Sequence, residues 1–413
     1  MSRLAGGGRN RKVFLWSLVL GVLVAVFADG CSWVGFERVS EKGPAGALVK
    51  LSPAAYPRFR DWFGYDANLQ RALKMSLAFL ERLPDERELC FGPDRYTVAH
   101  LRQSLKLFAD FLCLQPDEAR LNRFIRHNYN VYAAAGRRGR QQVLFTGYFE
   151  PELEGSLEKS EEFPVPLHRR PADLVTVDLG LFSRDLKGRR IVGRVEGNRF
   201  LPYWDRSQIN RRADLLEKAR PVAWVRSRVD RFFLQIQGSG RIYLDDGTSL
   251  SVHYDGANGR PYRSIGRLLI DRGKIPAEKM SMQAIRRYLE KHPREMDEIL
   301  HHNPSYVFFR VEEKGPLGCL NVPLTPGRSL ATDRRLFPPG GLCYVKTRIP
   351  LSKGSGTVGG WLNYFGFAMN QDTGGAIRGP GRADFFWGSG PYAAVAAGHM
   401  QEPGRLYFLV LKP

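Results

Sequence analysis

Apolar residues between positions 66 and 130 recur at spacings of three and four, the period of an amphipathic helix with one buried face. Two such stripes are present. Their members are Leu69, Leu73, Leu77, Leu80 and Leu83 in the first, and Val98, Leu101, Leu105, Phe108 and Leu112 in the second. Asp117 then has the position of an N-cap before a third helix that carries Leu121, Phe124 and Ile125. The pattern predicts a helical region packed on a core.

The pattern changes after Gly136, where glycine and proline become frequent and short runs alternate apolar with polar residues. Such runs are typical of strands separated by turns. The expected strands lie at 141–149, 173–182, 221–229 and 231–244. A helical interval follows at 263–273, closed by Gly273, and at 281–302, interrupted at Pro293. The last hundred residues are predicted to be β again, from 307–313 through 340–351 to 405–411.

The first 31 residues have a different composition, in which basic residues precede the apolar run Val13 to Ala28. This is the pattern of a secretory signal rather than of a core helix. A small residue, Gly30, stands directly before Cys31, as in bacterial lipoprotein signals, so we expect Cys31 to become the lipidated N-terminus. Asp29 fits that signal poorly, and retention as a membrane anchor or plain secretion stay open. Each alternative places the remaining chain outside the cytoplasm.

Composition limits the class of partner and of site. The 413 residues carry a net charge of +20, which favours an anionic partner such as lipid headgroups or an acidic wall polymer. Nucleic acid is not expected, because the chain is exported and shows no nucleic-acid-binding signature. Beyond Cys31 the chain has four scattered cysteines, which allow disulfides such as Cys319 to Cys343 in an oxidising compartment and argue against a zinc site. We expect neither metal nor cofactor.

Two carboxylates flank a glycine-rich turn in QDTGGAIRGPGRADFFWGSG, residues 371–390. Asp384 is followed by three aromatic residues, and burial beside apolar rings raises the pKa of a carboxyl group, as an acid that protonates a glycosidic oxygen requires. On a strand, Asp384 and Phe386 would face one side, and Phe385 and Trp387 the other. Tyr148, Phe149, Tyr203 and Trp204 are either sugar-stacking surfaces or core residues.

Other chemistries have weaker support. The chain has no Gly-x-Ser-x-Gly motif, and Ser239 lies in a glycine turn without an obvious partner histidine. His301 and His302 point in different directions on a helix and suit a surface better than a metal. The DTG triplet at 372–374 suggests an aspartic protease, but the chain has no second triplet to supply the other carboxylate.

Seven ordered motifs, which span more than 260 residues, resemble those of the membrane-bound lytic murein transglycosylase A family. They are FTGYFEP (145–151), QIQGSGR (235–241), PYRSIG (261–266), SMQAI (281–285), NPSYVFF (303–309), GRSLATD (327–333) and DTGGAIRG (372–379). The last portion is similar to the family's three-aspartate segment, with Asp333, Asp372 and Asp384 at its three acidic positions. One or two extra residues, of which Pro380 and Gly381 are the best candidates, lengthen the turn before Asp384.

The resemblance implies a mainly β fold with N-terminal helices. It consists of a double-psi β-barrel and an inserted second β-barrel-like domain, with a groove between them for glycan strands. The expected division is a signal and lipobox at 1–31, the helical part of domain 1 at 32–147, the inserted domain at 148–311 and the barrel part of domain 1 at 312–413.

The resemblance also implies a reaction. The β-1,4 bond between N-acetylmuramic acid and N-acetylglucosamine is cleaved without water, and the muramyl C6 hydroxyl attacks to leave a 1,6-anhydro end. Because this hydroxyl is held in place, one carboxyl can act first as acid and then as base. Asp384 is the expected acid and Asp372 its orienting partner. The expected substrate-binding residues are Asp333, Thr146, Gly147, Tyr148, Gln237, Gly238, Ser239, Gly240 and Trp387.

Two alternatives stay open at this level: a noncatalytic glycan-binding barrel and a hydrolytic endoglycosidase. The expected location is the periplasmic side of the outer membrane of a Gram-negative bacterium, with peptidoglycan as the main partner and a lipid anchor to the membrane. A partner in a cell-wall synthesis complex and the oligomeric state are left open.

Overall fold

The computed structural model describes residues 46–313, 315–353, 357–375 and 377–413. The predicted signal segment and Cys31 lie outside the described residues. Within them, none of the helices has the length and apolar character needed to cross a membrane.

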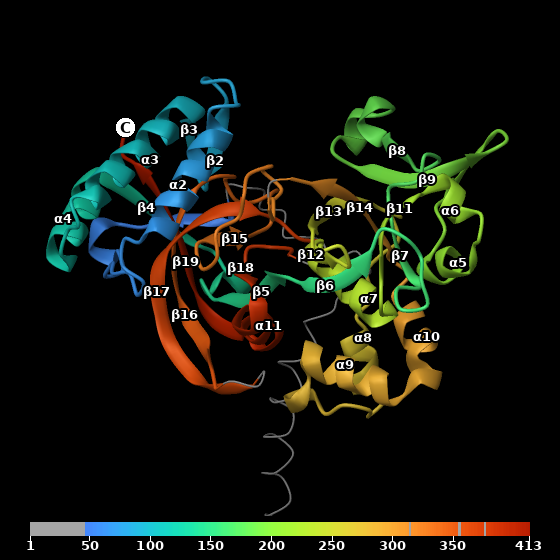
Figure 1. The fold of residues 1–413 in the computed structure, drawn as a ribbon. Helices are drawn as coiled ribbons and strands as arrows, with labels where there is room; N and C mark the ends of the chain where they lie inside the picture. The colour runs from blue at the N-terminus through green and yellow to red at the C-terminus, as the bar shows by residue number, and fades with distance from the viewer. Residues whose placement is uncertain (1–45, 314, 354–356, 376) are drawn as a thin grey trace, which may run out of the picture.

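Six strands close into a barrel at one end of the molecule (Figure 1). The order β19-β16-β17-β15-β18-β5 returns to its start because β5 pairs with both β18 and β19. The strands are β5 (Val143–Glu150), β15 (Ser329–Ala331), β16 (Leu342–Ser352), β17 (Val358–Asp372), β18 (Arg382–Ser389) and β19 (Gln401–Leu411). Two strands, β4 (Tyr129–Ala134) and β1 (Leu48–Lys50), continue the sheet beyond β19.

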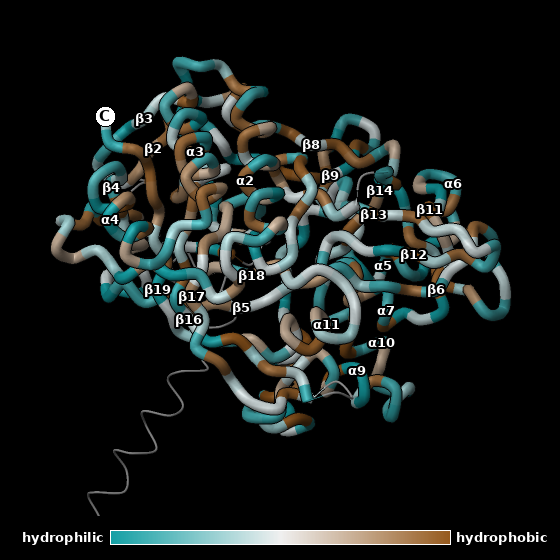
Figure 2. Tube along the Cα trace, turned by 60° about the vertical axis from the view of Figure 1, so that its left-hand side comes forward, coloured by the Kyte–Doolittle hydropathy of each residue, from teal (hydrophilic) through white to brown (hydrophobic). Residues whose placement is uncertain are grey.

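The N-terminal helices pack against this barrel as the apolar stripes predict. They are α2 (Ala67–Leu80), α3 (Val98–Cys113) and α4 (Glu118–Asn128), and α2 and α3 are separated by the hairpin β2 (Glu88–Phe91) and β3 (Asp94–Thr97). All five members of the second stripe are buried in one core with barrel residues such as Phe367 and Phe408. Asp117 caps α4 through a bond from the backbone N–H of Arg120, as predicted. Apolar and polar residues alternate along these elements in Figure 2, in keeping with one buried face.

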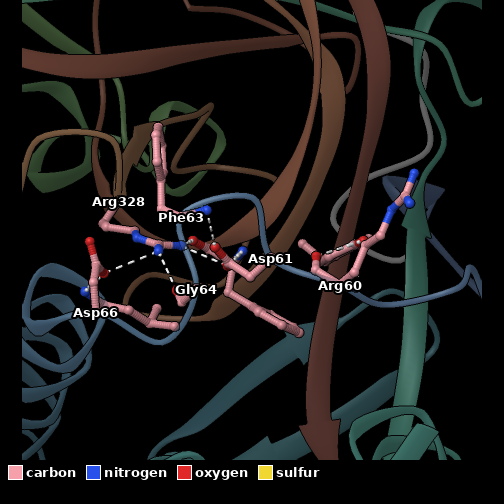
Figure 3. A network of polar contacts seen from close by, with 9 residues as sticks. Arg60, Asp61, Phe63, Gly64, Asp66 and Arg328 are labelled. Carbon is pink, nitrogen blue, oxygen red and sulfur yellow. Dashed lines mark hydrogen bonds and ion pairs between the residues drawn. The ribbon is translucent and has the colours of Figure 1, made fainter. Parts of the chain in front are cut away.

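A buried ion pair joins the segment before α2 to the barrel (Figure 3). Arg328 and Asp61 are both fully buried, with 2.7 Å between Arg328 Nη1 and Asp61 Oδ2. Arg328 also donates to the carbonyls of Gly64 and Phe367, at 2.7 and 3.0 Å. Burial raises the pKa of Asp61, whereas Arg328 and two backbone N–H groups favour its charged form. These bonds hold the strand β17 and the N-terminus of α2 together.

The inserted region is built on a six-stranded sheet of order β14-β13-β12-β6-β11-β7. The strands are β6 (Glu152–Ser156), β7 (Val165–His168), β11 (Pro221–Val225), β12 (Ser239–Leu244), β13 (Ser249–Ala257) and β14 (Val307–Glu312). No ladder joins β14 to β7 among the described residues, so the barrel-like closure expected for this domain is not confirmed. A small sheet, β8 (Val175–Asp178), β9 (Arg190–Glu196) and β10 (Arg199–Pro202), lies at its outer side (Figure 1).

The helices of the inserted region bury their apolar residues in two clusters. They are α5 (Arg206–Arg211), α6 (Leu215–Lys218), α7 (Arg228–Gln237), α8 (Ile265–Asp271), α9 (Met282–Lys291) and α10 (Pro293–His301). Residues of α7 to α10 form one cluster, and Ile209 of α5 and Leu215 of α6 belong to the other. The predicted helices at 263–273 and 281–302 are confirmed, with Gly273 at a positive φ of 66° after α8. In the last hundred residues, which were predicted to be β throughout, one further helix appears, α11 (Gly390–His399).

Three strand predictions in this region are wrong in part. The strand expected at 173–182 is confirmed only at Val175–Asp178, before a 3-10 turn at Leu179–Leu181, and the strand expected at 221–229 ends at Val225. Residues 231–237 were also expected to form a strand, but they belong to α7. Ser227 caps the helix by accepting from the N–H groups of Val229 and Asp230, and Gly238 ends it at a φ of 84°, which favours glycine. The strand begins only at Ser239.

Candidate active site

The register of three barrel strands brings Asp372 and Asp384 to the same place. The short strand β15 lies between β17 and β18, and its last residue, Ala331, is the partner of Asp372 on one side and of Asp384 on the other. Because neighbouring strands are about 4.8 Å apart, the two backbone positions are separated by roughly 10 Å and present their side chains to one face. The glycine-rich turn joins the two strands beyond this point.

Asp384 is mostly buried but keeps one oxygen free. Its Oδ1 accepts from the hydroxyl of Thr146, its partner on β5, and lies 3.5 Å from Nη2 of Arg382. Its Oδ2 has no hydrogen-bond donor within the described part of the chain. Burial raises the pKa of Asp384, although Arg382 and Thr146 pull it in the opposite direction. The side chain is 18% exposed, so the free oxygen is accessible.

Asp372 is partly buried, and both of its oxygens are engaged. Oδ1 accepts from the N–H groups of Cys319 and Thr373, each at 2.8 Å, and Oδ2 accepts from the hydroxyl of Tyr148 at 2.8 Å. Burial raises the pKa of Asp372 to about 6, the three donors lower it, and the charge of Asp384 raises it. Asp372 is therefore held in place with a raised pKa and with no free oxygen.

Asp333 follows β15 by two residues and anchors the turn. Its side chain is fully buried and accepts from Nε and Nη2 of Arg335, at 2.9 and 2.6 Å, and from the N–H of Gly379 at 2.9 Å. Burial opposes its ionisation, but these donors prevail and hold the pKa of Asp333 below its ordinary value. The geometry is that of a structural carboxylate tied to the segment that carries Asp384.

The segment Thr146, Gly147 and Tyr148 of β5 lines the same place. Thr146 and Tyr148 face the carboxyls of Asp384 and Asp372, and the intervening Gly147 faces the core. A Cβ on Gly147 would lie 2.7 Å from the indole nitrogen of Trp387 and 2.9 Å from the backbone of α11. Glycine is therefore required for β5 to approach α11 this closely.

The aromatic residues after Asp384 alternate as predicted. Phe385 and Trp387 are buried in the barrel core with ring centroids 5.2 Å apart. Phe386 shares the face of Asp384 and contacts Tyr148, with centroids 5.2 Å apart. Trp387 is 6% exposed and supports β5 from inside.

The QGSG segment, residues 237–240, connects the inserted region to β5. The Gln237 side chain accepts from the N–H of Phe149 at 3.2 Å. Ser239 is paired with His253 on β13, and Gly240 is packed against Leu234 and the carbonyl of Pro151. Gly238 supplies the left-handed residue that ends α7. These residues hold the two domains together beside Tyr148.

Two polar residues of the site were not anticipated. Arg382 could have been found from the sequence, because it lies two residues before Asp384 on one strand and so shares its face. Cys319 could not, since its N–H reaches Asp372 only through the turn after β14, where the N–H of Leu317 also lies 3.4 Å from Nδ1 of His253.

The structure also shows the surroundings of Tyr203 and Trp204, the two aromatic residues considered for sugar stacking in the inserted region. Tyr203 is fully buried and bonds Asp173 at 2.8 Å, so it is a core residue, not a sugar-stacking surface. Trp204 lies between the guanidinium groups of Arg194 and Arg212, at 3.5 and 4.2 Å from its ring.

The suggested disulfide between Cys319 and Cys343 is absent: both are free thiols, as are Cys90 and Cys113. Cys343 is fixed inside β16 and Cys319 lies in a turn. Residues 46–413, apart from the few not described, contain no group of three or more acidic, histidine or cysteine side chains arranged for a metal.

The site thus combines a closed β-barrel with two buried carboxyls of raised pKa, a chemistry typical of enzymes that act on glycosidic bonds. Comparison with known proteins agrees. A family model described as the MltA specific insert domain matches residues 144–310, and a 3D domain model matches residues 328–410. Membrane-bound lytic murein transglycosylase A of Escherichia coli (strain K12) is 35% identical over 274 residues, 66% of either chain. Its counterpart in Vibrio cholerae is 31% identical over 273 residues, 65% of this chain and 66% of the relative.

Solved structures extend the likeness to most of the chain. The crystal structure of MltA from Neisseria gonorrhoeae in its monoclinic form has 30% identity and a TM-score of 0.67, covering 89% of this chain and 93% of that one. A membrane-bound lytic murein transglycosylase from Agrobacterium tumefaciens has 29% identity and a TM-score of 0.71, with coverages of 88% and 98%. E. coli MltA with bound chitohexaose has 26% identity and a TM-score of 0.68, with coverages of 91% and 98%. The chain belongs to the membrane-bound lytic murein transglycosylase A family.

Proposed function

We propose that the chain is a peptidoglycan lytic transglycosylase that cleaves the bond between N-acetylmuramic acid and N-acetylglucosamine and leaves 1,6-anhydro ends. The observation that carries the proposal is the free, accessible Oδ2 of Asp384 beside an Asp372 whose oxygens are both engaged. A carboxyl that gives its proton to a substrate needs a free oxygen that can touch it. Asp384 has that oxygen and Asp372 does not.

Asp384 acts in two steps in this mechanism. As an acid it protonates the glycosidic oxygen, and the N-acetylglucosamine leaves with that proton. As a carboxylate it then takes the proton of the muramyl C6 hydroxyl while the oxygen bonds to C1. The proton lost in the first step is regained in the second, so the carboxyl ends as it began and no water is consumed.

Asp372 orients the site in this proposal and is not the acid. Burial raises the pKa of both carboxyls, that of Asp372 to about 6. Three hydrogen-bond donors occupy both oxygens of Asp372, so it has no free oxygen to touch the substrate, whereas Asp384 has one. A glycan over Asp384 would exclude water from it and raise its pKa further, in the direction that the acid requires.

The glycan is proposed to lie in a groove between the barrel and the inserted domain. Support comes from Tyr148 of β5, which donates to Asp372, and from Gln237 at the end of α7, which bonds the backbone of β5. It also comes from a similar structure, E. coli MltA with bound chitohexaose. Thr146 would orient Asp384, while Gly147 and Trp387 would support β5 from the core. Gly238, Ser239 and Gly240 shape the junction, and Asp333 holds the turn.

Mass spectrometry of the products of purified murein tests the proposal and separates it from its two alternatives. A lytic transglycosylase gives anhydro-muramyl ends, a hydrolytic endoglycosidase gives reducing ends, and a noncatalytic glycan-binding protein gives no product. The Asp384→Asn protein is the matched control for contaminating activity. Reducing ends or an unchanged polymer would contradict the proposal.

We also propose that Cys31 is acylated and attaches the protein to the outer membrane on its periplasmic side. The support is the sequence pattern before Cys31 and the membrane-bound relatives. Cys31→Ala should release an active enzyme from the membrane fraction, because stable attachment by acyl chains requires more than one of them and this residue would carry them. If the wild-type protein keeps an intact N-terminus and Cys31→Ala still sediments with membranes, the apolar run itself is the anchor.

A further inference from the structure

A cavity of about 850 Å³ opens in the inserted domain, away from the residues of the candidate active site. Its walls come from α5, α7, α10, the start of β7 and the residue after α8. Four arginines line it, together with two histidines and two carboxylates: Arg211, Arg228, Arg231 and Arg272, His301 and His302, Asp297 and Glu298. None of Asp333, Asp372 and Asp384 contributes to it.

Arg231 is the buried cation of this cavity and has no acidic partner. It is 5% exposed, and its N–H groups reach only neutral acceptors, the carbonyl of Pro166 at 3.2 Å and the side chain of Asn210 at 2.8 Å. Its Nε is buried without any partner among the described residues. Arg206 lies behind it, 2% exposed and bonded to neutral oxygens only. Two adjacent buried cations are therefore uncompensated.

The carboxylates at the mouth do not compensate for these cations, because each is already held by another arginine. Arg228 contacts Asp297 at 2.5 Å and Arg272 contacts Glu298 at 2.6 Å. Arg211 is exposed at the mouth, donates to the Ser207 hydroxyl at 2.6 Å, and makes no ion pair with any residue that the structure describes. The cavity therefore carries a net positive charge.

An exposed arginine of the same domain, in contrast, has carboxylate partners. Arg226, on the surface, is bonded to two carboxylates, Glu154 at 2.7 Å and Glu162 at 2.6 Å. A buried charge without a counterion is costly, and an oxyanion bound by arginine N–H groups would remove that cost through short charge-assisted hydrogen bonds. Burial lowers the pKa of His301, so its ring is neutral and can bond a ligand without adding charge.

We infer that this cavity is a binding site for an oxyanion, a carboxylate or a phosphate group, with Arg211 and Arg231 as its main donors. Two sources offer this chemistry: the carboxylates of the peptide stems of murein, and free or esterified phosphate. The inference is independent of the proposed transglycosylase activity, since no residue of the cavity belongs to the candidate active site.

Calorimetric titration of the full-length protein in detergent tests the inference with three probes. These are inorganic phosphate, a synthetic stem peptide with free carboxylates, and the same peptide fully amidated. We expect one of the two anionic probes to bind and the amidated peptide not to bind. Binding of phosphate alone assigns the site to phosphate, and binding of the acidic peptide alone assigns it to the wall. Both outcomes support an oxyanion site.

Three variants make the result specific. Arg211→Glu should weaken binding at least about tenfold, the loss typical of one charge-assisted contact. Arg189→Glu makes the same charge change on the surface of the same domain, outside the cavity, and should leave affinity within about twofold.

Asn210→Asp places a carboxylate of the same shape beside Arg231, so it should abolish anion binding and raise the melting temperature. The inference is overturned if no anionic probe binds at millimolar concentration, or if Arg211→Glu and Asn210→Asp bind as the wild type does. It is also overturned if Arg189→Glu loses as much affinity as Arg211→Glu.

Discussion

The carboxylates buried in the barrel and against it differ in what surrounds them. Asp61 is fully buried against the guanidinium of Arg328, which forms an ion pair with it at 2.7 Å. Asp372 has only neutral donors, and Asp384 has its nearest cation, Arg382, at 3.5 Å. Burial raises the pKa of all three carboxyls, but the buried guanidinium beside Asp61 ties that carboxylate into the fold. A carboxyl that has no cation so close and keeps a free oxygen is available for acid catalysis, and Asp384 has both features.

The largest expected effect is on catalysis and comes from a change at Asp384. Asp384→Asn should lower kcat on murein about 10³-fold or more, because the amide keeps the shape but has no transferable proton. The Thr146 hydroxyl can still donate to the remaining oxygen, so circular dichroism and sacculus binding should be unchanged. Asp372→Asn is the matched variant and should retain more activity. If Asp372→Asn were the dead protein and Asp384→Asn the active one, the roles would have to be exchanged.

Arg328→Met tests the structural carboxylate, Asp61. This change leaves Asp61 buried and unpaired, and should reduce the free energy of unfolding by about 3–5 kcal/mol. Urea denaturation measures it. Arg226→Met removes an exposed arginine that is also bonded to carboxylates and should cost less than about 1 kcal/mol. Equal losses in the two variants would mean that burial does not distinguish the two ion pairs.

Much of this architecture was predictable, and the failures have physical reasons. The helices α2 to α4 follow from the period of their apolar residues, and the cap of α4 follows from Asp117. The barrel closure does not, because it depends on the three-residue strand β15 and on β5 pairing with two strands distant in sequence. The helix α11 has an alanine-rich sequence without an apolar stripe.

Some features of the candidate site could likewise be predicted from the sequence, and others could not. The two faces of β18 follow from strand alternation, so Asp384 with Phe386 and Phe385 with Trp387 were separable from sequence. The bond from Tyr148 to Asp372 joins residues 224 apart in the chain and had no local signal. The sequence therefore could not predict the environment of each carboxyl, which decides its pKa, because residues distant in the chain supply that environment.

A smaller effect sharpens the difference between Asp372 and Asp384. Tyr148→Phe removes one of the three donors to Asp372, so the pKa of Asp372 should rise above about 6 and its carboxyl should be held less firmly beside Asp384. We expect kcat to fall about tenfold with little change in KM, the size of one hydrogen bond to a charged group. Tyr243→Phe removes an exposed hydroxyl from Glu152 and is the control. A wild-type kcat in Tyr148→Phe would show that the Tyr148 hydroxyl does not contribute to catalysis.

The smallest effect concerns the one cation near Asp384. Arg382 lowers the pKa of Asp384, so Arg382→Gln should raise it. Because the acid must be protonated, the pH above which kcat/KM declines should then move upward, while kcat at the optimum changes less than about threefold. Arg382→Lys keeps the charge and should keep the wild-type profile. A downward move of that limb in Arg382→Gln would contradict the acid role of Asp384.

The central claim is that Asp384 serves the sugar's own hydroxyl and that no water enters the bond. Digestion of murein in water enriched in ¹⁸O tests it most directly, with mass spectrometry of the released muropeptides. We expect products that carry a 1,6-anhydro end and no ¹⁸O from the solvent. Products with one ¹⁸O at a new reducing end, formed by the wild type and not by Asp384→Asn, would show a hydrolase and contradict the account.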